Sequence, residues 1–174
     1  MKKGQNQMSE SEYPIPIDPN KPKLLWMSNS PLVNTGYGTV SRNVVFRLRD
    51  RGYPIDFLAY YGQEGYTMPY RGIMIYPKLF HPISRDALEL LVNFHRPDIP
   101  IALYDIWVTI EQGQAWFAKC HPYSTVYTPI DHTPMPRAIY HGCRDAYQTI
   151  AMSEYAYDLM NEAGLNPILI PHGV

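Results

Sequence analysis

The chain has 174 residues, 45% of them apolar, which is enough to form the core of one globular domain of ordinary size. Fifteen basic and sixteen acidic side chains leave a formal net charge of −1, so no bulk positive field exists to attract nucleic acid. The two cysteines, at 120 and 143, show no spacing typical of a disulfide framework or a zinc site, which favours a reducing, cytoplasmic location.

Membrane insertion and secretion are not expected. Lys2 and Lys3 have no apolar stretch behind them, and no apolar run approaches the ~18 residues that a membrane-spanning helix needs. Contact with a membrane surface remains compatible with the sequence.

Strands and helices are expected to alternate along most of the chain. Residues 1–22 are polar and contain four prolines, so we expect an extended or disordered leader before a domain at 23–174. Hydrophobic periodicity predicts strands at 23–28, 55–60, 72–76, 99–104, 124–130, 146–152 and 167–170, and helices at 39–51, 84–95, 111–119, 136–143 and 153–164. This order predicts an α/β fold with a Rossmann-like, doubly wound, mainly parallel sheet and helices on both faces.

A glycine loop connects the first predicted strand to the first predicted helix. Gly36, Tyr37 and Gly38 lie where backbone N–H groups at a helix start are still unpaired, which favours an anion and above all a phosphate. Valine at Gly38 is therefore expected to obstruct a phosphate far more than it disturbs the fold.

Several polar residues follow the predicted strands, at the edge where open α/β sheets bind ligands. They are Ser28, Asn29, Asp105, Asp131, His132, Ser153, Glu154 and His172. Each has a structural alternative, since Ser153 and Asp105 are suited to cap helices and a single histidine such as His132 is more often a packed residue. Their shared position favours a site.

A metal centre and a serine nucleophile both lack the expected spacing. The histidines at 121, 132, 141 and 172 match no short metal-ligand motif, and no Gly-x-Ser-x-Gly segment is present. We expect neither a metal nor a cofactor. The tyrosine-rich loop at 61–71, which contains Tyr66, is a candidate binding surface or packs onto the sheet.

Residues 36–41 come close to a dinucleotide-binding fingerprint, with Asp56 lying 20 residues beyond Gly36. However, residues 29–35 separate the glycines from the strand, and Asp56 is near the start of its strand instead of the end. An NAD(P)-dependent oxidoreductase domain therefore remains a minority alternative, beside a non-catalytic module that binds a nucleotide or a protein partner.

Seven short segments resemble the retaining glycosyltransferases of family 4, which have the two-domain GT-B architecture. They keep family order at 34–39 (Asn-Thr-Gly-Tyr-Gly-Thr), 48–55, 96–99 (Arg-Pro-Asp-Ile), 104–107 (Tyr-Asp-Ile-Trp), 126–132, 150–154 (Ile-Ala-Met-Ser-Glu) and 170–174 (Ile-Pro-His-Gly-Val). The resemblance implies an N-terminal, acceptor-side domain whose donor-binding partner domain is absent from these 174 residues. By itself the chain is expected to be inactive.

The resemblance also assigns roles to residues of this sequence. It implies transfer of a sugar from a nucleotide-sugar donor to a sugar, lipid-linked or other acceptor. The donor diphosphate would lie at Gly36, Tyr37 and Gly38, and the catalytic residues would be His132 and Asp131. The acceptor would contact Asn34, Asp105, Trp107 and Tyr66. The rim of the cleft would carry Ser153, Glu154 and His172. Ile130 stands where the family histidine is expected, so either the register differs by two or that histidine is missing.

Overall fold

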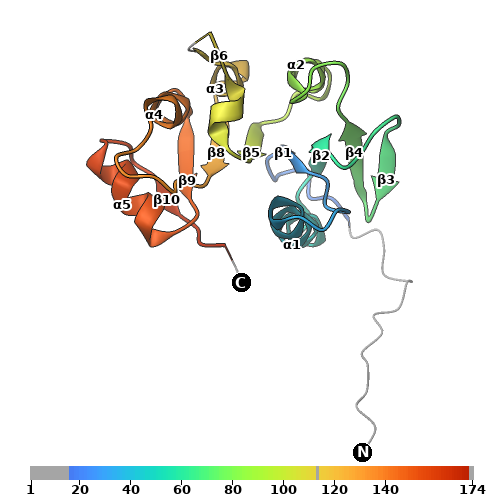
Figure 1. Cartoon of the computed structure of the whole chain (residues 1–174). Helices are drawn as coiled ribbons and strands as arrows, with labels where there is room; N and C mark the ends of the chain where they lie inside the picture. The colour runs from blue at the N-terminus through green and yellow to red at the C-terminus, as the bar shows by residue number, and fades with distance from the viewer. Residues whose placement is uncertain (1–15, 113, 173–174) are drawn as a thin grey trace, which may run out of the picture.

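A computed structural model of the chain describes residues 16–112 and 114–172 and has the predicted alternation of strands and helices (Figure 1). The strands are β1 (Leu24–Asn29), β2 (Ile55–Tyr61), β3 (Met68–Tyr70), β4 (Ile73–Pro77), β5 (Ile99–Leu103), β6 (Ile110–Glu111), β7 (Gln114–Ala115), β8 (Thr125–Thr128), β9 (Gln148–Ala151) and β10 (Ile168–Leu169). The helices are α1 (Gly36–Asp50), α2 (Arg85–His95), the 3₁₀ helix η2 (Ile106–Thr109), α3 (Trp116–Cys120), α4 (Arg137–Arg144) and α5 (Glu154–Glu162).

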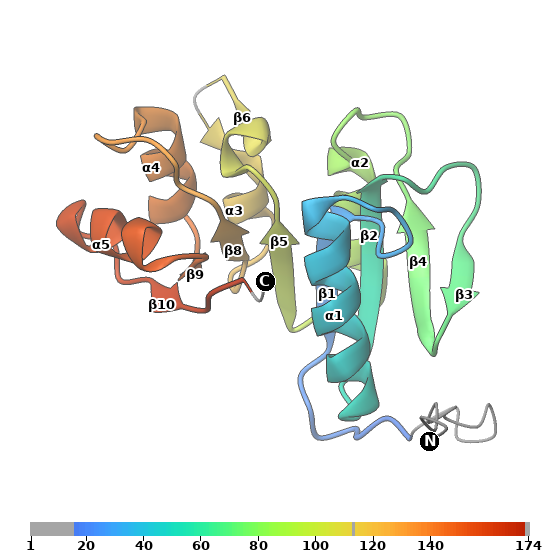
Figure 2. The same ribbon diagram turned by 60° about the horizontal axis from the view of Figure 1, so that its bottom comes forward.

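Eight strands form one sheet in the order β10-β9-β8-β5-β1-β2-β4-β3 (Figure 2). Every neighbouring pair is parallel except the edge pair β3–β4, so the prediction of a mainly parallel sheet is confirmed. From β1 the chain builds the sheet first toward β4 and then, after α2, in the other direction from β5. The strand order therefore reverses between β1 and β5, the topological switch point of this Rossmann-like sheet.

The two faces of the sheet carry different numbers of helices. α1 covers one face, where Val45 and Phe46 belong to the same buried cluster as Trp26 of β1. Residues of α2, α3, α4 and α5 join the cluster on the other face, which includes Leu25 and Met27 of β1. All six residues of β1 are buried, as expected for a central parallel strand covered on both sides.

The predicted helix at 111–119 is wrong over its first half. The short hairpin β6–β7 occupies the start of this segment, and only Trp116–Cys120 is helical. Gln112 adopts a positive φ of 50°, a left-handed conformation that interrupts a right-handed helix and turns the chain back. The predicted loop at 61–71 likewise contains the short edge strand β3.

Contacts with the domain begin before residue 23. The amide of Asp18 donates a hydrogen bond to the carbonyl oxygen of Gly52 at 2.9 Å, and the ammonium of Lys21 lies 4.9 Å from the centre of the Tyr53 ring. Residues 16–22 thus follow the connection between α1 and β2 without forming a helix or strand. The first 15 residues of the expected leader lie outside the described residues.

The N-terminus of α2 is held by Asp86 and not by the serine at its N-cap position. Ser84 occupies the N-cap position at a φ of 60° and makes no side-chain capping bond, and its buried hydroxyl has no partner among the described residues. The Asp86 carboxylate instead accepts hydrogen bonds from the amides of Phe80, His81 and Ala87 at 2.9, 3.0 and 2.8 Å. Desolvation opposes its ionisation, but these bonds and nearby His81 outweigh it and lower the pKa of Asp86.

We expect Asp86→Asn to lower the unfolding free energy by about 1 kcal/mol at neutral pH, since an amide replaces the charged acceptor. Because the folded-state pKa is below the unfolded value of about 4, this stabilisation is complete above that value and is lost as pH falls through the folded-state pKa. Urea unfolding of Asp86→Asn and of the unchanged protein, from pH 7 down to acid pH, measures this difference in unfolding free energy. A difference in stability that persists unchanged in acid would contradict the assignment.

No helix in the described part of the chain combines the length and apolar character needed to cross a membrane.

Candidate functional site

The loop between β1 and α1 is closed by a capping threonine. The Thr35 hydroxyl oxygen accepts hydrogen bonds from the Asn29 side-chain amide at 2.9 Å and from the Gly38 backbone amide at 3.0 Å. This cap starts α1 at Gly36, three residues earlier than predicted. The backbone amides of Gly36 and Tyr37 have no hydrogen-bond partner within residues 16–112 and 114–172, and first-turn amides point out of the helix start.

Gly36 and Gly38 differ in what surrounds them. A β-carbon at Gly38 would lie 2.5 Å from the carbonyl oxygen of Val33 and 2.9 Å from that of Ser30, so only glycine fits between helix and loop. A β-carbon at Gly36 would meet nothing within 4 Å. Gly38 is therefore needed to build the loop, while Gly36 provides the open approach to the helix N-terminus.

Tyr37, Tyr60 and Asp105 meet at the switch point of the sheet. Tyr37 belongs to the first turn of α1, Tyr60 lies near the end of β2, and Asp105 follows β5. Burial raises the pKa of Tyr37, and the nearby Asp105 carboxylate raises it further. Burial and Asp105 likewise raise the pKa of Tyr60 to about 12. Both phenols stay neutral at physiological pH and are suited to donate hydrogen bonds.

The turn that carries Asp105 is held in place by its neighbours. The amide of Ile106 donates to the Thr128 hydroxyl oxygen at the end of β8, at 3.1 Å, and the Thr109 hydroxyl donates to the carbonyl of Ile106 at 2.7 Å. Trp107, in the same short helix, is 56% exposed. These bonds fix a turn that carries the half-buried carboxylate of Asp105 and, two residues further along, the accessible indole of Trp107.

Asp131 and His132 lie on the exposed side of this group. Their side chains are 77% and 70% exposed, and His132 Nδ1 bonds the Asp131 carboxylate. The negative charge of Asp131 also contributes, as the smallest of the causes, to the raised pKa of Tyr37. Asn34 lies at the outer side of the loop, where its side-chain oxygen is 3.4 Å from an Arg42 nitrogen.

Other predicted site residues lie elsewhere or have structural roles. Tyr66 lines a groove beside α2, with Leu90 and Phe94, and neither Tyr37 nor Asp105 belongs to the lining of that groove. The Ser153 hydroxyl caps α5 by accepting a hydrogen bond from Ala156 N at 3.1 Å, which is the structural alternative recognised from the sequence. Glu154 is exposed in the first turn of α5.

His172 faces a groove on the side of the sheet that α1 covers. Its ring packs edge-on against Tyr127 at 5.1 Å, and the groove of about 620 Å³ also has Thr39 and Asn43 in its wall. Desolvation lowers the pKa of His172, and its buried Nε2 has no partner among the described residues. His172 therefore lies beside α1 instead of next to His132.

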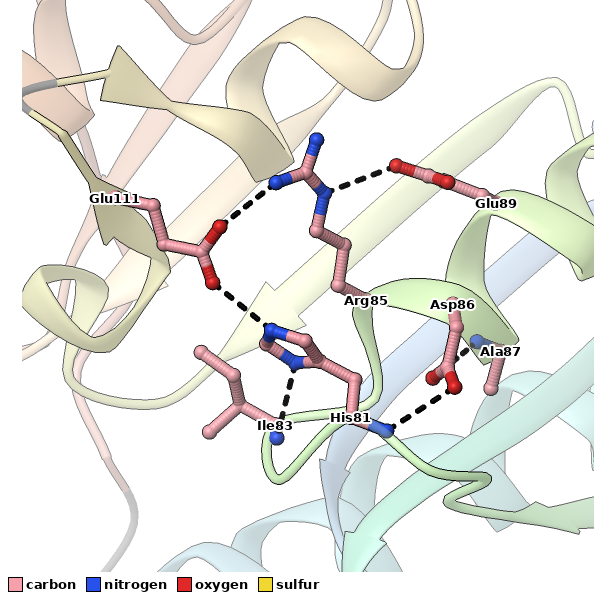
Figure 3. A network of polar contacts seen from close by, with 7 residues as sticks. All are labelled: His81, Ile83, Arg85, Asp86, Ala87, Glu89 and Glu111. Carbon is pink, nitrogen blue, oxygen red and sulfur yellow. Dashed lines mark hydrogen bonds and ion pairs between the residues drawn. The ribbon is translucent and has the colours of Figure 1, made fainter.

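A polar network fixes the hairpin β6–β7 to the start of α2 (Figure 3). Glu111 of β6 is bonded by His81 Nε2 at 2.9 Å and by Arg85 Nη1 at 2.7 Å, and Arg85 also bonds Glu89 at 3.0 Å. Desolvation opposes ionisation of Glu111, but the two hydrogen bonds outweigh it and lower the pKa of its carboxyl. The network holds the segment that follows Trp107 and so supports the rim of the site.

One group of the site, Tyr60, was missed in the sequence. Tyr60 ends a predicted strand, so the strand-end rule that selected Asp105 could also have selected Tyr60. Asp56 lies opposite Leu25 near the start of β2, and its carboxylate is 3.3 Å from His95 Nδ1. This position is far from the strand end that binds ribose in the dinucleotide fold, which weakens the oxidoreductase alternative.

Among the residues that the structure describes, no three His, Cys, Asp or Glu side chains are grouped to hold a metal ion. Comparison with known proteins adds no assignment: the chain matches no protein-family model and no curated protein sequence.

Proposed function

We propose that the chain is the acceptor-side half of a GT-B glycosyltransferase that transfers a sugar from a nucleotide-sugar donor with retention of configuration. The observation that carries this proposal is the convergence of the open α1 N-terminus at Gly36 with the Tyr37–Asp105 pair at the switch point. The order of the family-like segments supports it. The donor-binding half would supply the other wall of the cleft.

The site has groups suited to each part of the transfer. Departure of a nucleoside diphosphate develops negative charge, which the free amides of Gly36 and Tyr37 at the positive end of α1 would stabilise. Asp105 would orient the acceptor hydroxyl by accepting its hydrogen bond. Trp107 offers an apolar ring face against which the C–H groups of a sugar would pack.

An NMR titration tests the phosphate site directly. Sodium pyrophosphate, added to the ¹⁵N-labelled chain at millimolar concentrations, is expected to shift the amide signals of Gly36 and Tyr37 more than those of other helix starts. NAD⁺ is the control, and it should bind no more tightly than pyrophosphate. Unshifted Gly36 and Tyr37 signals would refute the phosphate site, and much tighter NAD⁺ binding would favour the oxidoreductase alternative.

The need for a second domain has its own test. We expect the 174-residue chain to transfer or hydrolyse no sugar from UDP- or GDP-linked donors, because most donor contacts would come from the other half. Measurable turnover by the chain alone would contradict the proposal that a second domain supplies most contacts to the donor.

His132→Ala is expected to slow sugar transfer by the complete enzyme at least tenfold, about 1.4 kcal/mol of barrier, if the histidine acts beside the transferred sugar. Its side chain is 70% exposed, so the unfolding free energy should change by less than about 0.5 kcal/mol. Initial rates measure the first effect and urea unfolding the second. His141→Ala, on α4, is the matched control and should retain the full rate. An unaffected rate in His132→Ala would remove the residue from the catalytic group.

A further inference from the structure

A second concave surface lies away from the strand ends, between α2 and the connection from β2 to β3. This α2 groove has a volume of about 530 Å³, within the range of small-molecule sites. Its apolar wall comes from Leu79, Leu90, Leu91 and Phe94, with Tyr66 on the opposite rim. The proposed glycosyltransferase site uses none of these side chains except for the acceptor contact expected of Tyr66.

The rim of the α2 groove exposes large apolar side chains. Phe94 is 82% exposed, Tyr66 64% and Leu90 51%. Leu90 and Phe94 are four residues apart on α2, so they lie on one helix face beside the groove. A contiguous apolar surface of this kind is typical of a binding site.

One chain of polar groups reaches the groove. Asp56 Oδ2 lies 3.3 Å from His95 Nδ1, and His95 Nε2 lies 3.2 Å from the Tyr76 hydroxyl. His95 Nε2 and the Tyr76 hydroxyl share one hydrogen bond, whose direction depends on the imidazole tautomer, and the phenol oxygen can accept at least one further bond in either case. The Tyr76 oxygen then has lone pairs left to accept a hydrogen bond from a ligand.

The charge of the α2 groove limits what it can hold. The described residues that line it include no Lys, Arg, Asp or Glu. Two charged side chains that neighbour the lining in sequence, Lys78 and Glu64, pair with each other at 3.0 Å. Apart from His95, the lining has no side chain that could pair with a charged ligand, whereas an uncharged ligand needs only hydrogen bonds for its polar groups.

We propose that the α2 groove binds an uncharged amphipathic molecule, with an aliphatic or aromatic body against Leu90 and Phe94 and one hydroxyl that donates to Tyr76. The chemical class is that of a neutral long-chain alcohol. Its occupancy requires no sugar transfer, so it is independent of the proposed function.

The test uses 1-octanol and the ¹⁵N-labelled chain. Octanol is expected to shift the amide signals of Leu90, Phe94 and Tyr66 in a saturable way. Phe94→Glu should weaken octanol binding at least tenfold, because it places a charge on the apolar rim. Asn93→Glu is the matched control, with the same new charge at a neighbouring exposed position outside the groove, and should bind as the unchanged protein does.

The hydroxyl contact is tested with 1-methoxyoctane, which has the same chain but no donor. The unchanged protein should prefer octanol about fivefold, the effect of one hydrogen bond. Tyr76→Phe should abolish this preference while retaining binding of the chain, and urea unfolding checks that each variant is folded.

Three results would overturn the proposal. One is octanol shifts that map outside the α2 groove, and another is equal binding of octanol and its ether to the unchanged protein. The third is self-association that Phe94→Glu abolishes, which would make a second copy of the chain the occupant.

Discussion

Gly38→Val is expected to lower the unfolding free energy by about 3 kcal/mol or more, since it forces a side chain against backbone that cannot yield. The β-carbon alone would approach the carbonyl oxygens of Val33 and Ser30 to 2.5 and 2.9 Å. Relief requires the 30–35 loop to separate from α1, and this would break the capping bond from Gly38 to Thr35. Valine at Gly38 therefore damages the fold before it can obstruct a phosphate, in contrast to the sequence-based expectation.

Urea unfolding followed by circular dichroism measures this effect. Gly36→Ala is the control, because its β-carbon meets nothing within 4 Å and alanine favours a helix over glycine by up to about 1 kcal/mol. The control should be as stable as the unchanged protein or more so. Equal stabilities of Gly38→Val and the unchanged protein would show that the loop moves away from α1 without cost.

The sequence predicted the fold best where a segment is decided by its own residues. Residues of β1 and β5 form continuous apolar runs, and such runs become central strands because both faces of a parallel sheet are covered. Prediction from the sequence was less reliable where the backbone conformation of a single residue decides the local structure. The left-handed Gln112 creates a hairpin inside a predicted helix, and the left-handed Ser84 leaves capping to Asp86.

The candidate site was predictable in part for the same reason. Asp105 follows from the rule that ligands bind beyond strand ends, and Tyr37 from its place at the start of the first predicted helix, and both need only the order of strands and helices. The position of Tyr66 beside α2 depends on how the loop after β2 folds back. The polar contacts from Asp56 through His95 to Tyr76 join β2, α2 and β4. Contacts between three separate elements cannot be predicted from the spacing of residues along the sequence.

Gly36→Val is expected to weaken pyrophosphate binding at least tenfold while leaving the fold intact. Gly36 is the first residue of α1, and the space in front of it is open. A valine side chain would fill this space next to the amides of Gly36 and Tyr37. Since phosphate oxygens must come within hydrogen-bond distance of those amides, a branched side chain there excludes them.

The comparison of the two glycines separates binding from folding. Gly36→Val should unfold within about 0.5 kcal/mol of the unchanged protein, because the new side chain meets no neighbour. Its amide signals should stay in place when pyrophosphate is added, and Gly36→Ala should give an intermediate loss because its methyl group is smaller. Unchanged pyrophosphate affinity in Gly36→Val would exclude the α1 N-terminus as the phosphate site. The proposed cleft would then have to hold the donor through Tyr60, Asp105 and Asp131, whose two carboxylates repel a diphosphate, and the glycosyltransferase proposal would lose its main support.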